Sequence, residues 1–245
     1  MIMYFSGYQT SKELLEVNED FGLLTSFVEQ RKKKKVSFPS NRKIFLDSGA
    51  FSVMTGKAMI DIDEYIDFIK KHKKNIHIYA NLDFIGDYKK TEENQRYMES
   101  KGLNPLPTFH YKTDYNILKK MIVKYDYIGL GGLVPIAMKR NIMQKHLDNC
   151  FSIIKNKCKV HGWGISSKKK LFKYPFYSID STSWLMGGKF KRMYKNDGIG
   201  WKAEQGTPNI IAQGYKYTNV HNAKEIIKMV KQATQLWKKR GIKWD

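Results

Sequence analysis

The sequence is poor in cysteine and has no long apolar run. Two cysteines in 245 residues, Cys150 and Cys158, are too few for a disulfide framework or a complete zinc site. No apolar stretch approaches the roughly 20 residues that a membrane span needs. The first residues, MIMYFSGYQTSKELLE, lack the basic segment and long apolar stretch of a signal peptide. We therefore expect a cytoplasmic protein in a reducing compartment.

Acidic residues are also scarce. There are 44 Lys and Arg against 23 Asp and Glu, so the formal net charge is +21. An AT-rich genome would explain part of the lysine count, but not the shortage of acids, because codons for Asp and Glu are available there too. Such a charge favours a polyanionic partner, and nucleic acid is the expected one. The densest block, residues 31–35, either contacts phosphate or is a solvated connection.

The chain shows no internal repeat and no proline-rich linker, which indicates a single domain over residues 1–245. Helical periodicity marks residues 62–69, 115–125, 142–154 and 226–237, with Asp61 as a cap of the first helix and Gly241 as the stop of the last. Short apolar segments between them read as strands. They are Ile2–Ser6, Lys43–Leu46, Ile76–Leu82, Leu106–Phe109, Tyr127–Leu130, Lys159–Trp163, Phe176–Ile179 and Asn209–Ala212.

This alternation predicts an α/β fold, a (β/α)8 TIM-like barrel. Residues 168–174 are too few for a full crossover helix, so an irregular barrel or an open doubly wound sheet stays an alternative. In a barrel the carboxyl ends of the strands converge on one mouth, where the active site lies. Asp47, Asp83 and Asp180 each follow or end a predicted strand, as do His110 and His161. A single Asp in this position is usually a turn former or helix cap, so the prediction depends on the whole set. Carboxylates there would repel phosphates, which suggests contact with a base or a sugar carbon.

Five segments, in this order, resemble the tRNA-guanine transglycosylases. DSGAF at 47–51 is similar to their Asp-Ser-Gly element, and NLD at 81–83 falls where they have a base-recognising aspartate. GLGGL at 129–133 matches their Gly-Gly-Leu loop. HGWGIS at 161–166 and IDSTSW at 179–184 resemble the segments before and around their nucleophilic aspartate.

The sequence also departs from the tRNA enzymes. No cysteine follows Asp180, so the zinc subdomain of those enzymes is not expected. Phe109 and His110 replace a family glutamine, and the chain is much shorter. It is most similar to the short, zinc-free DNA 7-deazaguanine transglycosylases of bacteriophages, the DpdA group. That resemblance implies a queuosine-related DNA modification in the host cytoplasm, of the kind that evades restriction.

The resemblance also implies the roles of the residues. Asp180 would attack C1′ of the sugar and form a covalent glycosyl-aspartate, and Asp47 would handle protons. Asp83 would accept hydrogen bonds from the guanine edge, and Trp184 would stack on a flipped base. Phe190 is equally well explained by core packing. No metal and no cofactor is required. The substrate-binding set would be Asp83, Ser48, His110, Gly131, Gly132, Leu133, His161 and Trp184.

The expected partners are duplex DNA and a free 7-deazaguanine base, such as 7-cyano-7-deazaguanine or a derivative. Basic side chains outside the mouth would hold phosphates. They are Lys168, Lys169, Lys170, Lys189, Lys191 and Arg192. Three alternatives remain: the same exchange on tRNA, a glycosylase that hydrolyses the intermediate, and a nucleic-acid-binding barrel without catalysis. The sequence leaves open which deazaguanine is used, the DNA context and the oligomeric state.

Overall fold

The computed structural model describes residues 1–57, 59–196, 201–205, 208 and 214–244. Its strands β1 to β8 form one parallel sheet and alternate with helices, which confirms the predicted α/β fold of the (β/α)8, TIM-like class. The chain divides into two compact units. We call Leu23–Trp163 the central unit, and Met1–Gly22 with Gly164–Asp245 the terminal unit.

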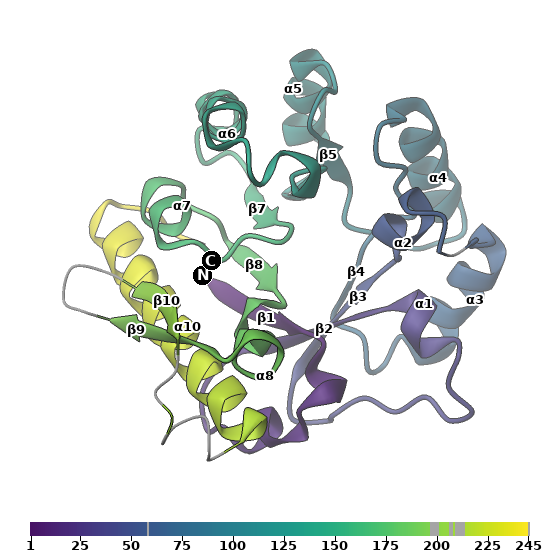
Figure 1. Cartoon of the computed structure of the whole chain (residues 1–245). Helices are drawn as coiled ribbons and strands as arrows, with labels where there is room; N and C mark the ends of the chain where they lie inside the picture. The colour runs from purple at the N-terminus through teal and green to yellow at the C-terminus, as the bar shows by residue number, and fades with distance from the viewer. Residues whose placement is uncertain (58, 197–200, 206–207, 209–213, 245) are drawn as a thin grey trace. The chain divides into compact units, whose positions relative to one another are not determined.

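The central unit contains most of the parallel strands (Figure 1). β3 (Lys43–Asp47) pairs with β4 (Ile78–Tyr79), and a bridge between Ala80 and Leu106 links the end of β4 to the segment before β5. β5 pairs with β6, and β6 with β7. The bounds are β2 (Gly22–Ser26), β5 (Thr108–His110), β6 (Tyr127–Gly131) and β7 (Lys159–Gly162).

Aspartate caps fix where the helices of the central unit begin. Asp61, Asp87 and Asp114 each accept a hydrogen bond from a backbone N–H in the first turn of the helix that follows. Apolar side chains of α3 then pack with strand residues into a core that includes Phe27, Leu46, Tyr65 and Ile69. The helices are α1 (Phe27–Gln30), α2 (Ala50–Met54), α3 (Ile62–His72), α4 (Tyr88–Ser100), α5 (Tyr115–Lys124) and α6 (Arg140–Ile154).

The terminal unit is built on a parallel strand pair and one long helix. β1 (Ile2–Ser6) pairs with β8 (Ser178–Ser181), with Tyr4 opposite Asp180. The long helix α10 (Tyr215–Lys239) buries a continuous face that ends at Trp237, whose indole N–H donates to the carbonyl of Leu171 over 2.7 Å. The other elements are α7 (Lys168–Lys173), α8 (Met186–Phe190) and the antiparallel pair β9 (Arg192–Asn196) and β10 (Trp201–Gln205), together with short 3-10 turns.

Three strand predictions differ from the structure. β2 was not predicted, and β4 is much shorter than the predicted Ile76–Leu82. The predicted strand Asn209–Ala212 lies outside the described residues. The short helix α7 agrees with the short crossover expected at residues 168–174. No helix within the described ranges combines the length and apolarity needed to cross a membrane.

Candidate active site

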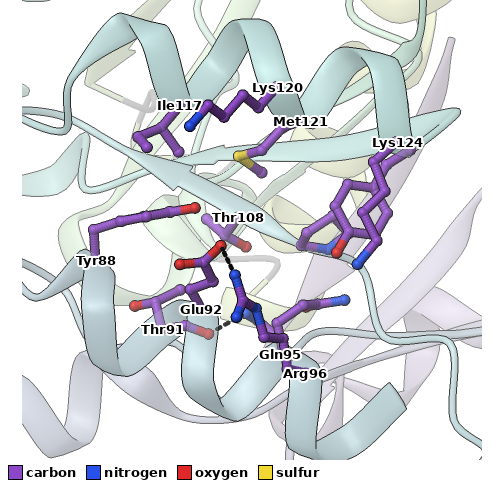
Figure 2. A pocket seen from close by; sticks show the side chains of 13 residues that line it. Tyr88, Thr91, Glu92, Gln95, Arg96, Thr108, Ile117, Lys120, Met121 and Lys124 are labelled. Carbon is purple, nitrogen blue, oxygen red and sulfur yellow. Dashed lines mark hydrogen bonds and ion pairs between the residues drawn. The ribbon is translucent and has the colours of Figure 1, made fainter. Parts of the chain in front are cut away.

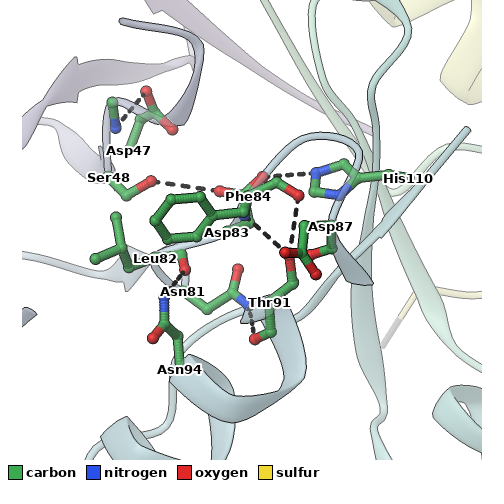
Figure 3. A network of polar contacts seen from close by, with 11 residues as sticks. Asp47, Ser48, Asn81, Leu82, Asp83, Phe84, Asp87, Thr91, Asn94 and His110 are labelled. Atoms are coloured by element: carbon green, nitrogen blue, oxygen red, sulfur yellow. Dashed lines mark hydrogen bonds and ion pairs between the residues drawn. The ribbon is translucent and has the colours of Figure 1, made fainter. Parts of the chain in front are cut away.

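Asp83 is the centre of a buried polar network in the central unit (Figure 3). Its Oδ1 accepts a hydrogen bond from Ser48 Oγ at 3.3 Å, and its Oδ2 lies 2.6 Å from His110 Nε2. Ser48 is fully buried, and His110 and Asp83 are 3% and 8% exposed. The three residues follow or end three different strands, so the predicted convergence of these residues is observed within this unit.

Helix α4 holds the loop that carries Asp83. The hydroxyl of Thr91 accepts from the N–H of Phe84 at 2.9 Å and lies within hydrogen-bond distance of the carbonyls of Phe84 and Asp87. Asn94 Nδ2 donates to the carbonyl of Leu82 at 2.7 Å. Figure 3 shows both side chains reaching from the helix to the backbone on either side of Asp83. The carboxylate is therefore positioned by bonds to the chain before and after it.

The glycines at the end of β6, Gly131 and Gly132, make room for His110. A Cβ at Gly131 would lie 2.7 Å from Thr108 Cγ2 and 2.9 Å from His110 Cδ2, closer than real Cβ atoms approach. Gly132 has a φ of 67°, a left-handed conformation that favours glycine. Leu133 beside them is buried. The two glycines leave space for the imidazole, while the predicted contact of the backbone of all three residues with a base stays a prediction.

Asp47 ends β3 and turns its carboxylate to the loop that follows. Its Oδ2 accepts from the N–H of Gly49 at 3.2 Å. The pKa of the Tyr65 hydroxyl is raised well above its ordinary value, first by burial and then by the negative charges of Asp47 and Asp83. Tyr65 therefore stays protonated and donates to the carbonyl of Ala80 at 2.9 Å. Both carboxylates thus act on one buried hydroxyl in the central unit.

Asp180 belongs to the terminal unit and is 9% exposed. Its Oδ1 accepts from the N–H of Gly164 at 2.8 Å, and its Oδ2 accepts from Ser6 Oγ at 3.1 Å. One donor comes from the end of β1 and the other from the segment after β7. Since each carboxylate oxygen has its own donor, the orientation of the group is fixed.

Two predicted substrate contacts are wrong. Trp184 is completely buried, and its indole N–H donates to the carbonyl of Ser6 at 2.8 Å, so the ring packs in the core of the terminal unit instead of stacking on a base. His161 is also completely buried, against Phe45 and Trp163 at centroid distances of 4.8 and 4.4 Å. Both side chains face inward because they pack on neighbouring aromatic rings, which a motif match does not reveal.

The predicted phosphate-binding side chains are mostly exposed. Lys169, Lys189, Lys191 and Arg192 are exposed, whereas Lys168 and Lys170 are half-buried. Phe190, for which core packing was an equal reading, is 55% exposed with Lys189 Nζ over its ring at 5.2 Å. Binding of phosphate by these six residues stays a prediction.

The structure does not support Cys150 as a nucleophile paired with His146 in the central unit. Cys150 lies near His146, with Sγ 3.6 Å from Nε2. Burial raises the pKa of the Cys150 thiol and lowers the pKa of His146 to about 4, so thiol and imidazole are both neutral near pH 7 and no thiolate is available. In the part of the chain that the structure describes, no three His, Cys, Asp or Glu side chains gather as metal ligands.

Sequence reasoning gave no role to four residues that position Asp180 and Asp83. Ser6 and Gly164 donate to the carboxylate of Asp180, and Thr91 and Asn94 hold the loop of Asp83. Ser6 ends a predicted strand, so the rule that selected Asp47 would also have found it. Thr91 and Asn94 gave no signal, because their helix lacks an apolar stripe.

In the comparisons with known proteins, no family model and no curated protein matches the chain.

Proposed function

We propose that this protein exchanges guanine in duplex DNA for a 7-deazaguanine base through a covalent glycosyl-aspartate. The observation that carries the proposal is the Asp83 carboxylate, which is nearly buried at a strand end and held by Ser48 and His110. A carboxylate has about four acceptor sites, so two remain after these contacts. The N1–H and N2 amino groups of guanine supply two donors with matching spacing.

Asp180 is the proposed nucleophile. Its carboxylate attacks C1′, the C1′–N9 bond breaks, and guanine leaves with the bonding electrons and a proton. The incoming base loses its N9 proton, attacks C1′ and releases the carboxylate. Two inversions restore the original configuration. The contacts from Gly164 and Ser6 support this role because they preset the orientation of the attacking group.

Asp47 is the proposed proton carrier. It is less buried than Ser48 beside it, and its Oδ2 accepts a hydrogen bond from the N–H of Gly49 at 3.2 Å. In its protonated form Asp47 gives a proton to the departing guanine, and the carboxylate that results takes one from the incoming base. The net charge of +21 supports a nucleic-acid substrate, and the exposed residues Lys189, Lys191 and Arg192 are the proposed phosphate contacts.

A base-exchange assay tests the proposal. The protein is incubated with labelled guanine or 7-cyano-7-deazaguanine and either duplex DNA or tRNA, and the nucleosides are identified after digestion. Label in DNA is the expected result. Label in tRNA alone would show that tRNA, and not DNA, is the substrate. Release of guanine without incorporation would indicate a hydrolase, and no reaction would favour a binding protein.

Variants separate the nucleophile from a structural residue. Asp180→Asn should abolish exchange and the covalent protein–DNA adduct seen by denaturing mass spectrometry, while DNA affinity stays within about twofold. Asp67→Asn is the matched control, because Asp67 is an exposed aspartate on α3. Normal turnover by Asp180→Asn would refute the assignment.

A further inference from the structure

Exposed apolar side chains flank the Asp83 network in the central unit. Eight large apolar side chains of this unit are exposed within the described residues, and six of them follow β3 or β6 directly; the other two are Tyr97 and Val123. We call the six the apolar rim: Phe51, Met54, Met59, Val134, Met138 and Ile142. Met59 and Met138 are 88% and 93% exposed. Exposed apolar groups concentrated in this way indicate contact with a partner.

Both parts of the apolar rim leave the same edge of the sheet. β3, β4, β5 and β6 are parallel neighbours, linked between β4 and β5 by the bridge from Ala80 to Leu106. The segments that follow β3 and β6 therefore start at the edge where Asp83 and His110 also lie. Three strand spacings place the two segments about 14 Å apart, with the Asp83 network between them.

Hydrogen-bonded turns hold the apolar rim in place. After β3, Thr55 donates twice to the carbonyl of Phe51, from its hydroxyl at 3.0 Å and from its N–H at 3.1 Å. After β6, the 3-10 turn η3 (Val134–Ile136) is anchored by the buried Ile136, whose carbonyl accepts from the N–H of Lys139 at 2.9 Å. Because the turns are already formed, a partner that binds the rim loses less entropy in ordering it.

Positive charge accompanies the apolar rim at this edge. Four exposed cations lie in the segments after β3, β5 and β6: Lys57, Lys112, Lys139 and Arg140. None of the four has an ion pair within the part of the chain that the structure describes. The aspartates of the same edge are engaged as helix caps, namely Asp61, Asp87 and Asp114. Unpaired cations beside apolar groups match a nucleic acid, whereas a second copy with the same net charge of +21 would be repelled.

The cavity between α4 and α5 has a different character (Figure 2). Its Arg96 is paired with Glu92 and its Lys124 with Glu99, each at 2.8 Å. No residue of the apolar rim lines it. Lys120 lines it from α5, so the exposed pair of residues 119 and 120 supplies control cations that lie on a helix and not on a segment that follows a strand.

We infer that the apolar rim opens a DNA duplex around the target guanine, with its side chains inserted between bases and the four cations on neighbouring phosphates. Phe, Met and Ile are residues that wedge between base steps, and a base can enter an enzyme pocket only when it leaves the stack. A span of about 14 Å equals about four steps of 3.4 Å, so the two turns contact bases on opposite sides of the extruded guanine. The inference rests on the proposed function, because it takes the Asp83 network as the pocket for that guanine.

Two duplexes of one sequence with a single G·T mismatch test the inference, one labelled with fluorescein and one with 2-aminopurine beside the mismatched guanine. Anisotropy of the first gives the affinity, and fluorescence of the second rises when the neighbouring base unstacks. The wild type should bind and raise that fluorescence. Phe51→Ser combined with Met138→Ser should weaken binding about fivefold or more and reduce the rise. Val123→Ser is the matched control, because Val123 is 85% exposed near the end of α5, and it should behave as the wild type.

Charge variants test the phosphate contacts. Lys139→Gln combined with Arg140→Gln should reduce the slope of log affinity against log salt by about 2 and leave the fluorescence rise of the bound duplex unchanged. Lys119→Gln combined with Lys120→Gln is the matched control, for which the slope should equal that of the wild type. All the altered side chains are exposed, so each variant should fold normally, which circular dichroism checks.

Several results would overturn the inference. They are absence of DNA binding by the wild type, wild-type affinity and fluorescence in the variant of Phe51 and Met138, and an equal loss in Val123→Ser. A wild-type dimer that dissociates in the variant of Phe51 and Met138 while DNA affinity is unchanged, seen by sedimentation velocity, would assign the apolar rim to a contact between copies.

The base-exchange assay separates this inference from the proposed function. DNA binding that depends on the apolar rim, without base exchange by the wild type, would refute the reaction and support the rim as a DNA-binding surface. Base exchange by the wild type, with DNA binding that does not depend on the rim, would refute the inference alone.

Discussion

Removing the carboxylate of Asp83 should destabilise the central unit by an amount that follows from its two contacts. Asp83→Ala leaves Ser48 Oγ and His110 Nε2 buried without their acceptor. An unpaired buried polar group costs about 1–3 kcal/mol, so two of them should lower the free energy of unfolding by about 2–6 kcal/mol. Asp83→Asn keeps the size and one acceptor oxygen, so it should cost about 1–2 kcal/mol.

A double-mutant cycle isolates the contact between Asp83 and His110. Urea unfolding, followed by tryptophan fluorescence, is measured for Asp83→Ala, His110→Ala and the double variant. The 2.6 Å separation between carboxylate and imidazole predicts a coupling energy of about 1.5–3 kcal/mol. Additivity within about 0.5 kcal/mol would show that the two side chains do not interact, and the base-recognition proposal would lose its supporting geometry. Asp67→Asn with His110→Ala is the control pair, for which additivity is expected.

Burial lowers the pKa of His146 from 6.5 to about 4, so the unfolded state binds its proton first as the pH falls. The free energy of unfolding should therefore decrease between pH 6.5 and 4, by up to about 3 kcal/mol, and urea midpoints of His146→Gln should depend less on pH in that window. Thr108→Val should raise the unfolding free energy by about 1 kcal/mol because it removes an unpartnered buried hydroxyl; a lower urea midpoint would contradict this. Trp184→Ala should lower the free energy of unfolding by about 3–5 kcal/mol, as expected for a core ring. A midpoint of thermal unfolding close to that of the wild type would contradict the burial of Trp184. Changing Lys189, Lys191 and Arg192 to Gln should reduce the slope of log affinity for DNA against log salt by about 2–3, measured by fluorescence anisotropy, and an unchanged slope would exclude these side chains as phosphate contacts.

Apolar periodicity predicted the helices that pack on the core. Ile62, Ile66 and Ile69 share one face of α3, and Asp61 caps that helix as expected, its Oδ1 accepting from the N–H of Glu64 at 2.9 Å. Strand β2 escaped prediction because only Leu23 and Leu24 form its apolar run, too short to stand out from the adjacent loop. Periodicity therefore located long amphipathic elements and missed short buried ones.

The strand-end rule predicted the residues of the site better than their contacts. It selected Asp83 and His110, the family resemblance added Ser48, and the structure joins the three in one network. It gave no information on the direction of a side chain, which is set by packing. Trp184 and His161 sit in the same motifs as predicted site residues, yet both turn into the core.

Helix α4 shows why a functional element can be hard to predict. Its buried side chains include Thr91 and Gln95, polar residues where a core helix would have apolar ones. Thr91, with Asn94, holds the loop of Asp83, and Gln95 Nε2 donates to the carbonyl of Pro105 at 3.0 Å. The apolar stripe that would mark α4 as a helix is thus replaced by side chains that bond to the backbone of neighbouring segments. Local patterns fail most often where side chains serve a site instead of the core, and the polar face of α4 does so by holding the loop that carries Asp83.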